Sequence, residues 1–84
     1  MTETKMRDAI CANVARILKD ERDAKGLSMG SLADSAGLSR SMISLVERGL
    51  RNPSLETLLR IAQVLDIPLS DVIKRAEKSA AKSA

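Results

Sequence analysis

The sequence contains no aromatic residue, no histidine and a single cysteine, Cys11. Without aromatic side chains, the chain lacks the stacking platforms on which many proteins bind RNA or single-stranded DNA. Without histidine it lacks the commonest metal ligand and the usual general base, and one cysteine permits neither an internal disulfide nor a thiolate metal cluster. We expect Cys11 to be a small buried residue of a helix. These absences argue against an enzyme, so we expect no catalytic residue, no metal and no cofactor.

Long apolar runs are missing as well. No stretch approaches the roughly 18 residues of a membrane-spanning helix, and the first ten residues lack the basic-then-apolar order of a signal peptide. We therefore expect a cytoplasmic protein with no membrane partner. Fourteen Lys and Arg stand against 11 Asp and Glu, a net charge of +3. This mild excess is, by itself, weak support for an anionic partner.

Apolar residues recur at three- and four-residue steps, and nowhere do they alternate with the period of two that a half-buried strand shows. Serines are placed as helix N-caps and glycines as helix ends. The pattern predicts an all-α fold of five helices at residues 4–25, 28–37, 39–49, 54–66 and 68–73. We expect one domain over residues 1–74, followed by an Ala-, Lys- and Ser-rich tail at 75–84 that is a frayed helix or disordered.

The stretch from Met29 to Arg48 carries the clearest motif. Ala33 is small enough for two helices to cross closely, and Gly37 permits the positive φ of a tight turn between them. Ile43 and Val46 then point back into the protein from the next helix. This spacing favours a helix-turn-helix, whose second helix enters the DNA major groove. An ordinary corner of a helical bundle is the alternative.

On a helical wheel, the third expected helix has two different sides. Ile43, Val46 and the following Leu50 fall on the side that would pack on the other helices. The opposite side carries small hydroxyls, one leucine and arginine, which suits close approach to a polyanion better than the long charged side chains of a plain surface helix. That opposite side consists of Arg40, Ser41, Ser44, Leu45 and Arg48.

Residues 14–73 resemble the lambda-repressor-like, Cro-type (XRE-like) helix-turn-helix family. The matching pieces are KGLS at 25–28, LADSAGLSRSMIS at 32–44, VERG at 46–49, RNPSLETLLRIAQVLDIPL at 51–69 and DVI at 71–73. The resemblance implies a compact five-helix domain whose helix-turn-helix is formed by helices two and three. It favours small stand-alone members such as the controller proteins of restriction–modification systems, which implies a bacterial or phage-type, nucleoid-associated protein.

The resemblance also implies two sets of DNA contacts. Base edges would be contacted by Arg40, Ser41, Ser44 and Leu45. Leu45 replaces a long polar residue of the family, so it either meets a thymine methyl group or folds onto neighbouring side chains. Phosphates would be contacted by Ser28, Met29, Ser39, Arg48, Arg51 and Asn52, helped by backbone amides at helix starts. Simple solvation is the alternative for Arg48. Met29 stands where the family commonly has Gln, so the contact of that amide is missing or replaced.

Two further sets of residues have roles in the family. Arg22 and Glu47 correspond to a partly buried ion pair between helices one and three, which is structural rather than a DNA contact. The fifth expected helix carries more apolar surface than a terminal helix needs. We expect part of it to pack on the first helix and the remainder to form a dimer interface made of Ile67, Leu69, Val72 and Ile73.

These features predict a sequence-specific transcriptional regulator that binds double-stranded DNA. We expect it to bind a palindromic operator as a homodimer, with helix three in the major groove. A protein-interaction module, for instance an antitoxin-like partner that binds DNA secondarily, is the alternative. No cluster of residues suggests a pocket for a small-molecule effector.

Overall fold

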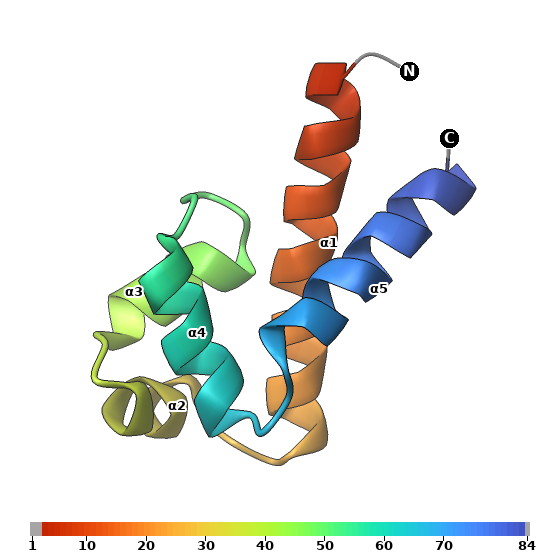
Figure 1. Ribbon diagram of the computed structural model, residues 1–84. Helices are drawn as coiled ribbons and strands as arrows, with labels where there is room; N and C mark the ends of the chain where they lie inside the picture. The colour runs from red at the N-terminus through yellow and green to blue at the C-terminus, as the bar shows by residue number, and fades with distance from the viewer. Residues whose placement is uncertain (1–2, 84) are drawn as a thin grey trace.

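Figure 1 shows the computed structural model, which describes residues 3–83. All regular structure in this part of the chain is helical, which confirms the all-α class and the number of helices expected. Short turns join the elements, and the two longest helices lie along one side of the molecule. The helices are α1 (Glu3–Ala24), α2 (Met29–Ala36), α3 (Arg40–Glu47), α4 (Leu55–Val64) and α5 (Leu69–Ser83).

The three central helices begin at serine N-caps with extended backbone. Ser28 Oγ accepts a hydrogen bond from Ser31 N at 3.0 Å, and Ser39 Oγ accepts one from Met42 N at 3.0 Å. Ser54 does the same at α4. Each cap satisfies a backbone N–H that has no partner inside its helix. The starts of α2, α3 and α4 are therefore set by local chemistry, as the sequence predicts.

The core is shared by all five helices, with α1 packing mainly on α5 and α3. Leu18, Leu32, Ile43, Ile61 and Leu65 are its largest fully buried side chains, together with Val72 of α5. Each comes from an apolar stripe on its own helix, as amphipathic periodicity requires. One of the buried residues is charged, Arg22 at the end of α1. The packing of α3 on this core decides which of its sides remains exposed.

The C-terminal segment differs from the expectation. α5 continues to Ser83 and packs along α1, so the expected fraying after residue 74 is wrong, and that boundary falls inside a helix. Val72, Ala76 and Ala80 follow one another at four-residue steps and are all fully buried. Alanine lets the two helices approach closely, and this close packing gives the segment the stability that its composition did not suggest.

Polar contacts add to the pairing of α1 and α5. Asn13 Nδ2 donates to the backbone oxygen of Ala76 at 3.1 Å, and Arg75 Nη1 donates to Glu21 Oε1 at 2.9 Å. The two helices run antiparallel (Figure 1), and these contacts join the middle and the C-terminal end of α1 to the middle of α5.

Two side chains lie in unexpected environments. Cys11 is exposed on α1 rather than buried. Leu50, expected to continue the apolar side of α3, is 61% exposed because the chain leaves the helix before it. Within residues 3–83, no helix combines the length and apolar character needed to cross a membrane.

Candidate nucleic-acid interface

Helix α3 has one side in the core and one side in solvent. Ile43 and Val46 are 0% and 3% exposed. On the other side Arg40 and Ser41 are exposed, as is Arg48 directly after the helix. Half-buried residues border this outward side, namely Ser44 and Leu45. The structure therefore brings the four expected base-contacting residues together on one accessible surface.

A tight turn sets the angle between α2 and α3. Gly37 has φ 70° and ψ 35°, a left-handed conformation that glycine adopts without a steric penalty. Its N–H and that of Leu38 both bond to Ala33 O, the latter at 2.9 Å. Ala33 itself is 2% exposed. These contacts close the end of α2 and direct the chain into α3 within three residues.

A buried ion pair fastens the far end of α3 to α1. Arg22 Nε donates to Glu47 Oε2 at 2.6 Å and Arg22 Nη2 donates to Glu47 Oε1 at 3.0 Å. The remaining Nη1 donates to Leu27 O at 2.7 Å. The two side chains are 9% and 3% exposed, which agrees with the structural role expected for this pair and keeps both away from any DNA surface.

The contact with Glu47 keeps the Arg22 guanidinium in its charged form. The hydrogen bond that Arg22 donates to Glu47 raises the pKa of the Arg22 guanidinium above its ordinary value, although burial acts in the opposite direction. Arg22 therefore stays protonated at any physiological pH. A bidentate arginine–carboxylate contact also restricts orientation, so the pair holds the end of α3 in a defined position on α1.

Two of the expected phosphate-binding residues are helix caps. Ser28 and Ser39 are exposed, and each already accepts a backbone N–H at the start of its helix. Ser28 also donates its hydroxyl to Ser31 Oγ at 3.0 Å. These serines lie at the N-termini of α2 and α3, where backbone N–H groups and the helix dipole favour an anion.

The side chain of Met29 does not belong to the polar surface. It is half-buried and packs against the hydrophobic core. As a thioether it has no N–H or O–H to donate to a phosphate. This side chain therefore cannot make the contact of the family's Gln amide, and the expected phosphate contact of Met29 is left to its backbone N–H.

The three remaining phosphate candidates line one groove. Arg48, Arg51 and Asn52 are exposed and border a groove of about 590 Å³ between α1, the end of α3 and the α3–α4 loop. From α1, Arg7 and Cys11 line the same groove. The sequence pattern predicts neither the groove nor a role for Arg7. Three arginines and one aspartate, Asp8, line this groove, so its walls carry a net positive charge.

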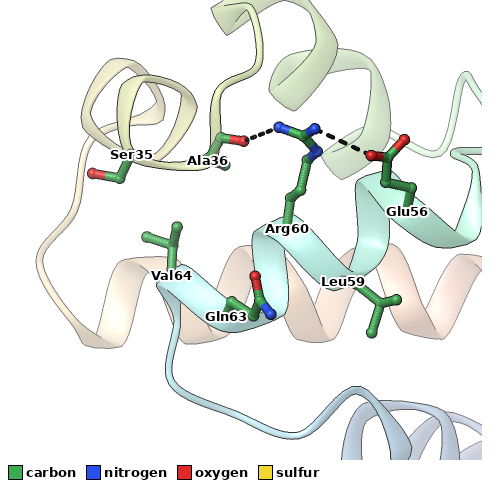
Figure 2. Close-up of a pocket in the computed structure, with 7 residues that line it drawn as sticks. All are labelled: Ser35, Ala36, Glu56, Leu59, Arg60, Gln63 and Val64. Carbon is green, nitrogen blue, oxygen red and sulfur yellow. Dashed lines mark hydrogen bonds and ion pairs between the residues drawn. The ribbon is translucent and has the colours of Figure 1, made fainter.

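Arg60 is a further residue whose role the sequence pattern does not reveal. Its Nη1 donates to Ala36 O at 3.3 Å, and its Nη2 donates to Glu56 Oε2 at 3.1 Å (Figure 2). The guanidinium thus lies against the C-terminal end of α2, where a cation is favoured by the helix dipole. It supports the turn from the α4 side, and the four-residue spacing to Glu56 is the only sign of it in the sequence.

The expected dimer interface is altered by the packing of α5. Val72 is fully buried in the monomer and cannot reach a second copy, so its assignment to the interface is wrong. Ile67, Leu69 and Ile73 are half-buried and pack against the edge of the core. Only part of each of these three side chains is therefore available to a partner.

The sequence is similar to known helix-turn-helix proteins. A family model described as helix-turn-helix matches residues 18–72. The HTH-type transcriptional regulatory protein MJ1164 of Methanocaldococcus jannaschii is 44% identical over 54 residues, which are 64% of this chain and 17% of that protein. The HTH-type transcriptional regulator SinR of Bacillus subtilis is 34% identical over 61 residues, 71% of this chain and 55% of SinR. The chain thus spans less than two-thirds of the length of either relative.

Solved structures show the same arrangement. The restriction–modification controller protein C.AhdI from Aeromonas hydrophila superposes with a TM-score of 0.70 and 41% identity over 75% of this chain and 94% of that chain. SinR in complex with DNA superposes with a TM-score of 0.68 and 34% identity over 71% of this chain and 97% of that chain. The curated relatives are named as regulators of transcription, in agreement with the prediction of a protein that is not an enzyme.

Proposed function

The chain belongs to the helix-turn-helix family, as the match over residues 18–72 shows, and from this premise we propose that it is a sequence-specific transcriptional regulator of double-stranded DNA. The observation that carries the proposal is the two-sided burial of α3. Ile43 is fully buried while Arg40 and Ser41 are exposed, so the outward side can enter the major groove without disturbing the core. The DNA complex of SinR supports the same use of this fold.

Sequence would be read by the outward side of α3. Arg40 can donate two hydrogen bonds to O6 and N7 of one guanine, a contact that contributes roughly 1–3 kcal/mol of discrimination. Ser41 and Ser44 carry short hydroxyls that can donate to or accept from a base edge. Leu45 is half-buried, and the exposed part of its side chain offers methyl groups to a thymine C5-methyl.

Phosphate contacts would position the protein on the duplex. Arg48, Arg51 and Asn52 lie along one exposed rim, and Arg7 of α1 extends that rim. The hydroxyl of Ser39 and the N–H groups that begin α2 and α3 would supply further hydrogen-bond donors to phosphates. These contacts contribute affinity without sequence information, and they make binding fall steeply with salt.

We further propose that the protein binds as a homodimer to a palindromic operator, in the cytoplasm and on the bacterial nucleoid. Two recognition helices about 34 Å apart would enter successive major grooves on one face of B-DNA. The similarity to the controller protein C.AhdI supports a small regulator of this kind. The exposed parts of Ile67, Leu69 and Ile73 are candidates for the edge of the dimer interface.

Selection of bound sequences from random duplexes tests the proposal directly, because a two-fold operator would give a palindromic consensus. On the selected site, we expect Arg40→Ala to lose about 1–3 kcal/mol of preference for the cognate base pair. Arg51→Ala should weaken binding to all duplexes alike and reduce the salt slope by about 0.9. Lys82→Ala is the matched control, since it removes one positive charge at the exposed end of α5.

Absence of any protected duplex in dilute buffer would overturn the proposed function, and a stoichiometric protein partner under the same conditions would favour an interaction module. If Arg40→Ala weakened all sequences equally, base readout by this residue would be refuted while DNA binding stood.

A further inference from the structure

Helix α4 carries an apolar stripe that no other part of the described structure covers. Leu55 and Leu59 are 67% and 43% exposed, and they lie one turn apart on one side of the helix. A single exposed leucine is ordinary on a protein surface. Two on adjacent turns form a continuous apolar row, and they are two of the three large exposed apolar side chains in residues 3–83.

A charged row with the same spacing runs beside this apolar row. Glu56 and Arg60 are also one turn apart, and their side chains are 75% and 46% exposed. Figure 2 shows Arg60 reaching toward Ala36 of α2 and Leu59 leaving α4 in another direction, and Glu56, Leu59 and Arg60 all line one hollow. Helix α4 therefore presents two parallel rows, one of leucines and one of opposite charges, each with a four-residue step.

Because both rows share one step, the face is complementary to a copy of itself. In an antiparallel pair related by a two-fold axis across the helices, leucine row meets leucine row and charged row meets charged row. In one register, Leu55 lies opposite Leu59 of the second copy and Glu56 lies opposite Arg60 of the second copy. Each pair is then offset along the helix axis by no more than one residue, about 1.5 Å. A parallel pair would instead set the leucines opposite the charges.

From this complementarity we propose that the leucine and charged rows of α4 form the two-fold contact of the homodimer. The inference rests on the proposed function, which requires two copies on one operator, and it places the centre of the contact on α4 rather than on α5. A hollow of about 570 Å³ is lined by residues of both rows, Glu56, Leu59 and Arg60. The contact is isologous, since each residue pairs with its counterpart in the other copy.

The size of this face predicts how tightly it associates. Two leucines and one charged pair per copy are far fewer than the roughly 20–30 residues per side of a standard interface. We therefore expect a weak dimer in free solution, with dissociation constants in the micromolar range or above. A duplex with two half-sites holds two copies side by side, so the same contact should appear there as cooperative binding.

A first experiment removes the apolar row. Leu59→Asp should weaken self-association in sedimentation equilibrium by at least about tenfold, because a carboxylate would face the leucine of the second copy. Leu50→Asp is the matched control, since it places the same charge on an exposed leucine outside α4 and should leave self-association unchanged. Circular dichroism melting of both variants checks that the fold is retained.

A second experiment uses the charges and does not depend on hydrophobicity. Glu56→Arg and Arg60→Glu should each weaken self-association by about tenfold, because like charges would face each other across the axis. An equimolar mixture of the two variants restores opposite charges across the axis, although each copy still has its own intrahelical pair broken. We expect the mixture to associate within about threefold of the native protein, measured with a fluorophore on the exposed Cys11.

Equal association of Leu59→Asp and the native protein would overturn the inference, as would a mixture that associates no better than its components. A native protein that stays monomeric at millimolar concentration and binds a two-half-site duplex without cooperativity would also overturn it. Binding to a duplex with one half-site separates this outcome from failure of the proposed function, because DNA binding by a monomer survives loss of the α4 contact.

Discussion

The α2–α3 unit and the α1–α5 pair are held in place by different kinds of interaction. α2 and α3 have eight residues each, and serine caps, a left-handed glycine and a buried ion pair fix their ends. α1 and α5 have 22 and 15 residues and meet along small buried side chains. Helices as short as α2 and α3 are unstable alone, whereas long helices gain from every residue of their contact.

This difference suggests where each region is sensitive. In the α2–α3 unit, a few polar groups at helix ends determine the direction of α3, so single substitutions there should have large effects. In the α1–α5 pair, stability is spread over many apolar contacts, so the critical property is how closely the helices approach. The α2–α3 unit, which would touch DNA, thus depends on a few polar contacts at its helix ends. The α1–α5 pair depends on the volume of the side chains between the two helices.

Removal of the buried carboxylate should have the largest effect. Glu47→Ala removes the bidentate partner of the buried Arg22 and leaves it only the counter-charge of Asp23 Oδ1, on a half-exposed side chain 3.4 Å from Nη2, so we expect a loss of about 3–5 kcal/mol in the free energy of unfolding. Urea denaturation measures the loss. A loss below about 1 kcal/mol would contradict the anchoring role, and with it the contrast between the two regions.

The double variant Arg22→Met with Glu47→Leu is the control for that substitution. It removes both charges together, so it should recover a large part of the lost stability. Recovery should remain incomplete, because Leu27 O loses the hydrogen bond that it accepts from Arg22 Nη1.

The α1–α5 pair should be sensitive to a larger side chain between its two helices. Ala76 is fully buried on α5, so Ala76→Leu must push the helices apart and should cost about 1–3 kcal/mol in urea denaturation. Ala81→Leu is the matched control on the exposed side of the same helix, where we expect a change within about 0.5 kcal/mol. Equal effects of the two substitutions would show that α5 does not pack closely on α1.

The contrast also explains which features the sequence could predict. The α2–α3 unit was predictable because its signals are local: Ser28 and Ser39 accept N–H groups three residues ahead, and Gly37 adopts the conformation that the turn needs. The pairing of Arg22 with Glu47 came from the family resemblance, since 25 residues separate them. The outward side of α3 followed from the helical period.

The end of α5 was not predicted because alanine is a weak hydrophobic signal. Val72, Ala76 and Ala80 do repeat at four-residue steps, but only the presence of α1 turns this row into a buried stripe. The same packing removed Val72 from the expected interface. The exposure of Cys11 and Leu50, like the groove beside Arg51, depends on where the α3–α4 loop runs relative to α1, which no local pattern specifies.

Alanine substitutions at two glycines would measure how strongly Arg60 constrains the α2–α3 turn. Gly37 and Gly26 have φ of 70° and 69°, so replacement by alanine should cost each about 1–2 kcal/mol from backbone strain. A Cβ at Gly37 would also lie 3.0 Å from Arg60 Nη1, whereas a Cβ at Gly26 meets nothing within 4 Å. Gly37→Ala should therefore be the more destabilising in thermal unfolding, and the additional variant Arg60→Ala should remove the difference. A Gly26→Ala penalty equal to or above that of Gly37→Ala would show that Arg60 adds no constraint at the turn.

The smallest expected effect lies in the loop that joins α4 to the α1–α5 pair. Asp66 follows the C-cap of α4 with φ 56°, and it is the one non-glycine residue with positive φ in residues 3–83. Asp66→Gly would relieve roughly 1–2 kcal/mol of left-handed strain and lose part of this gain, about 0.5–1 kcal/mol, to the greater freedom of glycine in the unfolded chain. We expect a net stabilisation of about 0.5 kcal/mol by urea denaturation, with Asp66→Asn as the control that keeps a side chain tolerant of this conformation. A loss of stability with glycine would mean that the Asp66 side chain itself helps to join α4 to the α1–α5 pair, by a polar contact as well as by packing.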